Sequence, residues 1–393
     1  MNSKPLRALF VLLMSAGLLG GCSAIGKTTD TVGGWFGFGK KRAAQPAPLT
    51  EFVQKAGLSR AWTASAGEAG RGLFMPAVDG NAVYAAGESG RVVRLGLQNG
   101  NEAWRVDTGR KLAAGVGAGA GLVLVGGLKG ELIALDAANG AKRWEVNLAS
   151  VVVAPPVVAG DLVLVRTGNG HVHGLNAADG SRKWLYTRQL PALSLQGVSA
   201  LAIRDGVAYA GFPGGKMAAI RLDNGLQVWE VSVSTPRGAT ELERVNDVVG
   251  MPALDDRRVC AVTYQGRVAC FDRIKGNQLW SRDTSSDAGL SMDDLYVYVS
   301  DDKDAVTAYD KDSGRAAWRQ DKLANRQITA PLVFGKYVVV ADVEGYVHLI
   351  STEDGSFAAR AQADGQVRVT PIDIGPGFAV QSVKGGVIAF KVN

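Results

Sequence analysis

Residues that carry catalytic or metal chemistry are scarce in this sequence. Its 393 residues include only three cysteines and three histidines. Three cysteines are too few for a disulfide-rich scaffold. There is no GxSxG, HExxH or CxxCH pattern, which argues against a serine hydrolase, a zinc peptidase and an attached c-type haem. His171 and His173 share one face of a predicted strand without a third ligand, so we predict no metal site.

Charge is also sparse. Charged residues make up 20% of the chain, and the net charge of +6 is spread along it without a basic stripe. Nucleic-acid binding needs such a stripe, so nucleic acid is not an expected partner. After residue 21, no apolar run approaches the ~20 residues that a membrane-spanning helix requires. The sequence therefore predicts no membrane-spanning helix in its body.

The N-terminal residues carry the most specific signal. Lys4 and Arg7 precede an apolar stretch that begins at Ala8 and ends in LGGC at residues 19–22. A charged start, a short apolar segment and small residues are typical of a secretory signal. The ending resembles the lipobox of bacterial lipoproteins, which implies cleavage before Cys22 and lipid attachment to it. Ser23 is not the aspartate that favours the inner membrane in that family, so we expect lipid anchoring on the periplasmic face of the outer membrane.

The composition divides the chain into three predicted segments. Residues 1–21 are a signal peptide, residues 22–57 an acylated N-terminus with a flexible tether, and residues 58–393 a folded body. The tether is rich in Gly, Ala and Pro and carries the basic run KKR at 40–42. Trp35, Phe36 and Phe38 lie beside that run, and they are either membrane-interface contacts or incidental aromatics in a spacer.

An internal repeat of about 40 residues covers the body. A Gly-x-x-x-Trp segment recurs, and a strand-like segment similar to Gly-x-Val-x-Ala-Leu precedes each copy. The seventh copy, Gly355–Ala359, lacks the tryptophan, and an eighth strand-like segment ends the chain at 385–390. Runs such as DLVLV (161–165) and KYVVV (336–340) are β-branched or aromatic and are bounded by Asp-Gly and Asn-Gly turns. These features favour strands over helices.

The repeat predicts an all-β fold, an eight-bladed β-propeller of four-stranded blades. The last blade lacks an outer strand at the C-terminus, and residues 58–62 can supply it. We therefore expect the N-terminal strand to complete the last blade and close the ring. The common position of the tryptophans in the repeats predicts packing between neighbouring blades for Trp62, Trp104, Trp144, Trp184, Trp229, Trp280 and Trp318.

The two cysteines of the body lie in one predicted hairpin, VCAVTYQGRVACF at 259–271. A two-residue turn at Gln265 and Gly266 would pair Cys260 with Phe271 and place the cysteines on opposite faces. We therefore expect Cys260 and Cys270 to be free thiols. A loop one residue longer would bring them face to face.

Segments such as ALDAANGAKRW (134–144) resemble the tryptophan-docking repeats of the pyrroloquinoline-quinone dehydrogenases. Those enzymes are eight-bladed propellers with a quinone and calcium on the axis, beneath a pair of adjacent cysteines. No adjacent cysteines occur in this sequence. We therefore expect no catalytic residues, no cofactor and no enzymatic activity.

The chain as a whole resembles the outer-membrane assembly lipoproteins of the BamB family, the propeller subunits of the β-barrel assembly machinery. The resemblance rests on the lipobox, the tether, the eight repeats and two segments that interrupt them, at 188–200 and 234–252. It implies a non-catalytic scaffold that binds the barrel subunit's periplasmic POTRA domains. It also implies a role in the folding and insertion of outer-membrane proteins, which are further expected partners.

The same resemblance places partner-binding residues in the two interruptions: Leu193, Leu195, Gln196, Glu243, Arg244 and Asp247. Gln196 stands where the family often has arginine, and Val249 replaces a second acidic residue. Loops on a rigid scaffold often carry binding residues, and an exposed apolar pair beside charges fits a modest interface. The alternative for the two leucines is a place in an inner strand of blade four.

Two other function classes stay open at this point. A quinone-dependent periplasmic dehydrogenase would show cofactor absorbance and calcium dependence in the purified protein. An envelope lipoprotein that binds a sugar or a peptide would bind its ligand without any barrel partner.

Overall fold

The structure, a computed structural model, describes residues 45–70, 72–195 and 199–393. Residues 45–393 form one compact unit. Regular secondary structure in the described residues consists of strands, β1 to β32. Among these residues there is no helix with the length and apolarity needed to cross a membrane. Cys22 and Gln196 lie outside the described residues.

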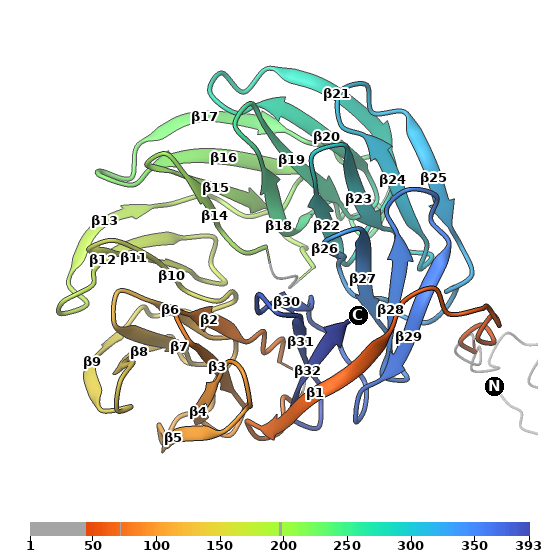
Figure 1. Ribbon diagram of the computed structural model, residues 1–393. Coiled ribbons are helices and arrows are strands. Elements are labelled where there is room, and N and C mark those ends of the chain that lie inside the picture. The colour runs from red at the N-terminus through yellow and green to blue at the C-terminus, as the bar shows by residue number, and fades with distance from the viewer. Residues whose placement is uncertain (1–44, 71, 196–198) are drawn as a thin grey trace, which may run out of the picture. The chain divides into compact units, whose positions relative to one another are not determined.

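The strands form eight antiparallel sheets of four strands each, arranged as blades of a ring (Figure 1). The strands of blade one are β2 (Ala77–Asp79), β3 (Ala82–Ala86), β4 (Arg91–Gly96) and β5 (Glu102–Asp107). Blade two has β6 (Gly117–Gly119), β7 (Leu122–Gly126), β8 (Glu131–Asp136) and β9 (Lys142–Asn147). Blade three has β10 (Val157–Ala159), β11 (Leu162–Arg166), β12 (Val172–Asn176) and β13 (Arg182–Tyr186). Blade four has β14 (Ala202–Arg204), β15 (Val207–Phe212), β16 (Lys216–Arg221) and β17 (Gln227–Ser232).

The second half of the ring repeats this pattern. Blade five has β18 (Val248–Leu254), β19 (Arg258–Thr263), β20 (Arg267–Asp272) and β21 (Gln278–Asp283). Blade six has β22 (Gly289–Met292), β23 (Tyr296–Ser300), β24 (Val306–Asp310) and β25 (Ala316–Gln320). Blade seven has β26 (Leu332–Phe334), β27 (Tyr337–Ala341), β28 (Tyr346–Ser351) and β29 (Phe357–Gln362). Blade eight has β30 (Ile372–Asp373), β31 (Phe378–Gln381), β32 (Gly386–Val392) and β1 (Leu58–Ser65).

The ring is closed by strand pairing between the two ends of the unit. β1 runs antiparallel to β32, with Leu58 opposite Val392 and Ser65 opposite Gly386. In Figure 1 the orange β1 therefore lies beside the dark blue β32. This arrangement confirms the predicted eight-bladed propeller and the predicted closure by the N-terminal strand. Pairing with β1 covers the outer edge of β32, which would otherwise be unpaired.

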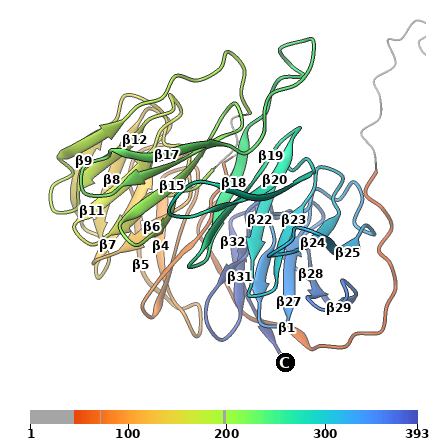
Figure 2. The ribbon, with the colours of Figure 1, turned by 90° about the horizontal axis from the view of Figure 1, so that it is seen from above.

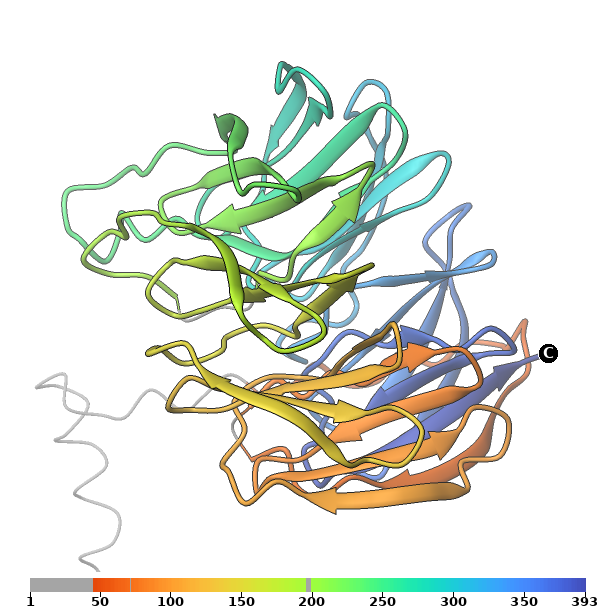
Figure 3. The same cartoon turned by 90° about the vertical axis from the view of Figure 1, so that its left-hand side faces the viewer.

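The core lies between the blades, because both faces of each sheet are covered by neighbouring sheets (Figures 2 and 3). Every residue of β7 and β27 is buried, and one cluster of buried side chains fills each of the eight junctions between blades. Strands covered on both faces read as continuous apolar runs. This explains why LVLVG and YVVVA show no alternation with polar residues.

The tryptophans join each blade to the next. Each indole N–H donates a hydrogen bond to a backbone carbonyl of the following blade, from Trp62 to Leu97 O at 3.0 Å through Trp318 to Thr352 O at 2.8 Å. The glycine of the next repeat lies against the indole ring. At Gly100, for example, a Cβ atom would come within 2.5 Å of the Trp62 ring. Its positive φ of 67° also favours glycine.

The hairpin of blade five corrects the prediction for the cysteines. Val262 pairs with Val268, so residues 264–266 form the loop, and Cys260 lies directly opposite Cys270. The two cysteines form a disulfide, with Cα atoms 4.1 Å apart, and both side chains are fully buried. The predicted two-residue turn was one residue too short, and such a shift changes which side chains share a face. The expectation of free thiols is therefore wrong.

The boundary of the folded unit also differs from the prediction. Residues 45–57, which we name the strap, were expected to belong to the flexible tether but pack on blade seven. The Phe52 ring stacks on Phe357 with centroids 5.4 Å apart, and the Ala47 N–H donates to Ala324 O at 2.9 Å. Tether composition did not reveal these contacts because the partners of the strap lie about 300 residues later in the chain.

Candidate partner-binding face

Because the strands of each blade are antiparallel, successive connections lie alternately at the two ends of the ring. Turns between the first and second strands, and between the third and fourth, lie at one end. Turns between the second and third strands lie at the other end, together with the connections from blade to blade. Both long interruptions of the repeat are such connections, since they join β13 to β14 and β17 to β18. We call the end that carries them the loop end.

The first interruption presents one leucine to solvent and buries most of another. Leu193 is 48% exposed, whereas Leu195 packs against the buried cluster of blades five and six. Neither lies in a strand, since β14 begins at Ala202. The alternative placement in an inner strand of blade four is therefore wrong. Arg188 fixes the start of this connection by pairing with Glu230 of β17.

The second interruption folds through its own polar groups. The Glu243 carboxylate accepts hydrogen bonds from the N–H groups of Ala239, at 2.8 Å, and Thr240, at 3.0 Å. These backbone donors, with that of Thr240 the largest influence, hold the pKa of Glu243 below its usual value. Arg244 Nε donates to Gly238 O at 3.0 Å. The resulting turn exposes Leu242, which is 72% accessible to solvent, and Figure 2 shows this green connection standing out from the sheets.

Asp247 is not the exposed acidic residue that the sequence suggested. It is only 3% exposed because the chain has already re-entered blade five, where β18 begins at Val248. Its Oδ1 accepts from the Gly214 N–H at 3.3 Å. Burial raises the pKa of Asp247, against opposing effects of the Gly214 and Leu195 backbone N–H groups and of Arg166. Asp247 therefore links the end of the second interruption to Gly214 of blade four and to Leu195 of the first interruption.

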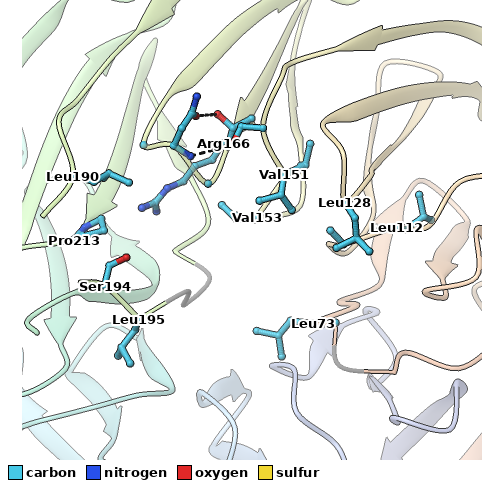
Figure 4. A pocket seen from close by; sticks show the side chains of 18 of the residues that line it. Leu73, Leu112, Leu128, Val151, Val153, Arg166, Leu190, Ser194, Leu195 and Pro213 are labelled. Carbon is cyan, nitrogen blue, oxygen red and sulfur yellow. Dashed lines mark hydrogen bonds between the residues drawn. The ribbon is translucent and has the colours of Figure 1, made fainter. Parts of the chain in front are cut away.

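A hollow of about 620 Å³ lies at the loop end beside the first interruption (Figure 4). Its walls are mainly apolar and come from the connections of several blades: Leu73, Leu112, Leu128, Val151, Val153, Leu190 and Leu195. Leu128 is 47% exposed on the turn between β7 and β8. An apolar hollow bordered by exposed leucines can receive apolar side chains of another protein, because their removal from water stabilises a contact.

One buried cation lies in the wall of this hollow. Arg166, at the end of β11, donates from Nη1 to Ser199 O at 2.7 Å, and its guanidinium lies 5.0 Å from the Phe212 ring centroid. Burial lowers the pKa of Arg166 to about 10, although Asp247 opposes the shift. The guanidinium stays charged at neutral pH and holds the end of the first interruption against blades three and four.

The described residues do not fit the quinone and calcium of the dehydrogenase propellers. The axial cavity, about 690 Å³, has a mainly apolar lining that includes Pro155, Pro252, Pro331 and Pro371, and its charged lining residues are Asp287, Arg368 and Asp373. The cysteines are bonded inside blade five and do not form an adjacent pair. In the described residues no three His, Cys, Asp or Glu side chains are grouped to hold a metal ion. His173 instead shares a hydrogen bond with Thr167 Oγ1 at 3.2 Å, and burial lowers its pKa to about 4.

Comparison with known proteins agrees with this geometry. The family model described as outer membrane protein assembly factor BamB matches residues 88–320 and 303–393. The chain belongs to the BamB family. It is 49% identical over 357 residues to the assembly factor BamB of Pseudomonas aeruginosa, covering 90% of this chain and 94% of the relative. It is 38% identical over 397 residues to BamB of Bordetella pertussis, covering 100% and 99%.

Solved structures show the same relationship. The crystal structure of BamB from Moraxella catarrhalis superposes with a TM-score of 0.79 at 28% identity, covering 85% of this chain and 99% of that one. The quinohemoprotein alcohol dehydrogenase of Comamonas testosteroni has a TM-score of 0.65 at 14% identity, covering 85% and 76%. The likeness to the dehydrogenase shows a shared propeller fold alone, in keeping with the resemblance of the repeats.

Sequence reasoning missed several residues of the loop end. Leu242 lay within the second interruption, and its apolar side chain in a polar segment without strand pattern was an available signal. Leu128 and Arg166 occupy regular blade positions, so nothing in the repeat marked them. Their place beside the first interruption follows only from the ring, which brings blades two, three and four together.

Proposed function

We propose that this chain is a non-catalytic scaffold lipoprotein of the outer-membrane β-barrel assembly machinery, anchored through Cys22 on the periplasmic face of the outer membrane. Its loop end binds the periplasmic POTRA domains of the barrel subunit, and the complex assists the folding and insertion of outer-membrane proteins. One observation carries the proposal: in a chain that belongs to the BamB family, both interruptions of the repeat emerge at the same end of the ring and expose leucines.

Physical features of the loop end support a docking role. The blades supply a rigid frame, since each is joined to its neighbours by buried clusters and indole hydrogen bonds. The charged groups of Glu243 and Arg244 are engaged by the second interruption itself, whereas Leu193 of the first interruption and Leu242 of the second are exposed. Exposed apolar anchors on a preformed surface bind with little loss of conformational entropy.

Substitution of both exposed leucines tests this proposal. Leu193→Glu combined with Leu242→Glu should reduce capture of the barrel subunit from detergent-solubilised envelopes by about tenfold or more, since a carboxylate in a desolvated apolar contact is costly. The measurement is the amount of barrel subunit recovered with the affinity-tagged lipoprotein, identified by mass spectrometry.

The matched control uses leucines of similar exposure at the opposite end of the ring. Leu226, 63% exposed, lies between β16 and β17, and Leu295, 66% exposed, lies between β22 and β23. The Leu226→Glu and Leu295→Glu double variant should capture the barrel subunit as the unmodified protein does. Full capture by a folded Leu193 and Leu242 double variant would refute the proposed face.

A further inference from the structure

The junction between blades seven and eight is built differently from the other seven. Its outer strand β29 carries Ala359 at the position where the tryptophan stands in the other repeats. Blade eight also has no turn between its third and fourth strands, because β32 ends at the C-terminus and β1 enters from the N-terminal side. Neither the indole nor the turn that would accept its hydrogen bond is present at this junction.

The last residues of the strap, 55–57, lie at this junction, whereas Phe52 packs against the cluster between blades six and seven. The N–H groups of Lys55 and Ala56 donate to Ala358 O of β29, at 2.8 and 3.2 Å. Gly57 and Asn393 exchange two backbone hydrogen bonds, at 3.1 and 2.9 Å, at the end of blade eight. The strap therefore bridges blades seven and eight, and Figure 1 shows its orange-red trace reaching β1 past blade seven.

An aromatic and cationic stack holds the middle of the strap. The Arg360 guanidinium lies 5.0 Å from the Phe52 ring centroid and 5.3 Å from that of Phe357. Its Nη1 donates to Thr50 O at 3.1 Å, and its Nε donates to His348 Nδ1 at 3.1 Å. A cation that lies against two stacked rings and donates to a backbone oxygen is well suited to hold an irregular segment on a sheet.

A buried ion cluster holds the start of the strap. Arg326 is 1% exposed, and its Nη1 donates to Ala47 O at 2.7 Å. Its Nε pairs with Asp342 at 2.6 Å, and Nη2 pairs with Glu344. Asp342 also accepts from His348 Nε2 at 3.1 Å. Without the strap, the Nη1 donor would lose its partner, and a buried unpaired donor is costly.

We propose that the strap is part of the ring closure: it replaces the missing tryptophan contact between blades seven and eight. Its first part is held on blade seven through Ala47 and Arg326. Blade seven lies across the eight-bladed ring from blade three, after which the first interruption emerges. Ala47 contacts the connection between blades six and seven, so the start of the strap lies at the loop end, on the side of the ring opposite the first interruption.

Hydrogen–deuterium exchange on the full-length protein tests the strap directly. In the unmodified protein, the Ala47 and Lys55 amides should exchange slowly, because both are hydrogen-bonded to blade residues. Phe52→Ala should accelerate exchange of the strap and of β29 about tenfold or more, because it removes one ring of the stack. Blades two to five should keep their exchange rates.

Val53→Ala is the matched control, because Val53 lies in the same segment and is 85% exposed. It should leave the exchange rates unchanged. Unprotected strap amides in the unmodified protein, or equal exchange in the two variants, would overturn the inference. A protected strap combined with unaltered capture by the Leu193 and Leu242 double variant would overturn only the proposed partner-binding face, so the two failures are distinguishable.

Discussion

The strap junction and the loop end use their charged residues in different ways. At the strap, Arg326 and Asp342 are buried and paired, and the guanidinium holds the chain's own backbone. In the two interruptions at the loop end, Glu243 and Arg244 are exposed and shape their own turn, and Leu193 and Leu242 are exposed to solvent. The contacts of the strap are made within the chain, whereas the loop end leaves apolar side chains exposed to solvent.

Two buried aspartates, Asp342 at the strap junction and Asp247 at the loop end, differ in the direction of their pKa shifts. Burial acts to raise the pKa of Asp342, but interactions with His348 and the hydrogen bond from Arg326 outweigh burial, so the pKa is lowered. The pKa of Asp247 is raised, because burial outweighs the Gly214 and Leu195 N–H groups and Arg166. The charged form of Asp342 therefore stabilises the fold, and the charged form of Asp247 opposes it.

The largest effect is expected at the strap junction. Asp342→Ala should lower the free energy of unfolding by about 3–5 kcal/mol, because it leaves the buried Arg326 without its carboxylate. The control Asp256→Ala removes an exposed ion pair with Arg204 and should cost about 1 kcal/mol or less. Denaturant unfolding of both variants measures the difference. Equal losses would show that the cluster does not support the strap.

The lowered pKa of Asp342 also predicts how the free energy of unfolding changes with pH. Because its folded pKa is lowered, the contribution of Asp342 is fully present above the unfolded value of about 3.9 and is lost as the pH falls through the folded pKa. The stability gap between the unmodified protein and Asp342→Asn should therefore narrow below about pH 4. A gap that stays constant across this window would contradict the assignment.

The next largest effect is expected at the disulfide beneath the loop end. Leu195 packs against the cluster that contains Cys260 and Cys270. Replacing both cysteines by alanine should lower the free energy of unfolding by about 2–4 kcal/mol. Peptide mapping without reductant should recover a crosslink between the two peptides. Recovery of both cysteines as free thiols would restore the register that the sequence first suggested.

The smallest effect is expected at Asp247. Asp247→Asn keeps the shape of the side chain and removes a buried charge, so stability near neutral pH should change by about 1 kcal/mol or less, or increase slightly. Measured beside Asp342→Asn in the same denaturant series, it sharpens the comparison between the two sites. A loss as large as that of Asp342→Asn would show that the Asp247 charge holds the loops.

The repeat made the architecture predictable, whereas details set by single residues were not. Periodic tryptophans and strand-like runs determine the number of blades, and Trp62 before the first blade indicates the closure. One additional loop residue reversed the prediction for Cys260 and Cys270, because strand faces alternate with every residue. The burial of Asp247 and the contacts of the strap depend on segments far apart in the chain, so no local pattern could reveal them.

Site-specific photocrosslinking in intact cells tests the central claim most directly. A photoreactive residue is placed at position 193 or 242 of the loop end, and at position 226 or 295 of the opposite end. The proposed function predicts crosslinks to the barrel subunit of the assembly machinery from 193 and 242 and none from 226 and 295. Crosslinks from the opposite end alone would contradict it.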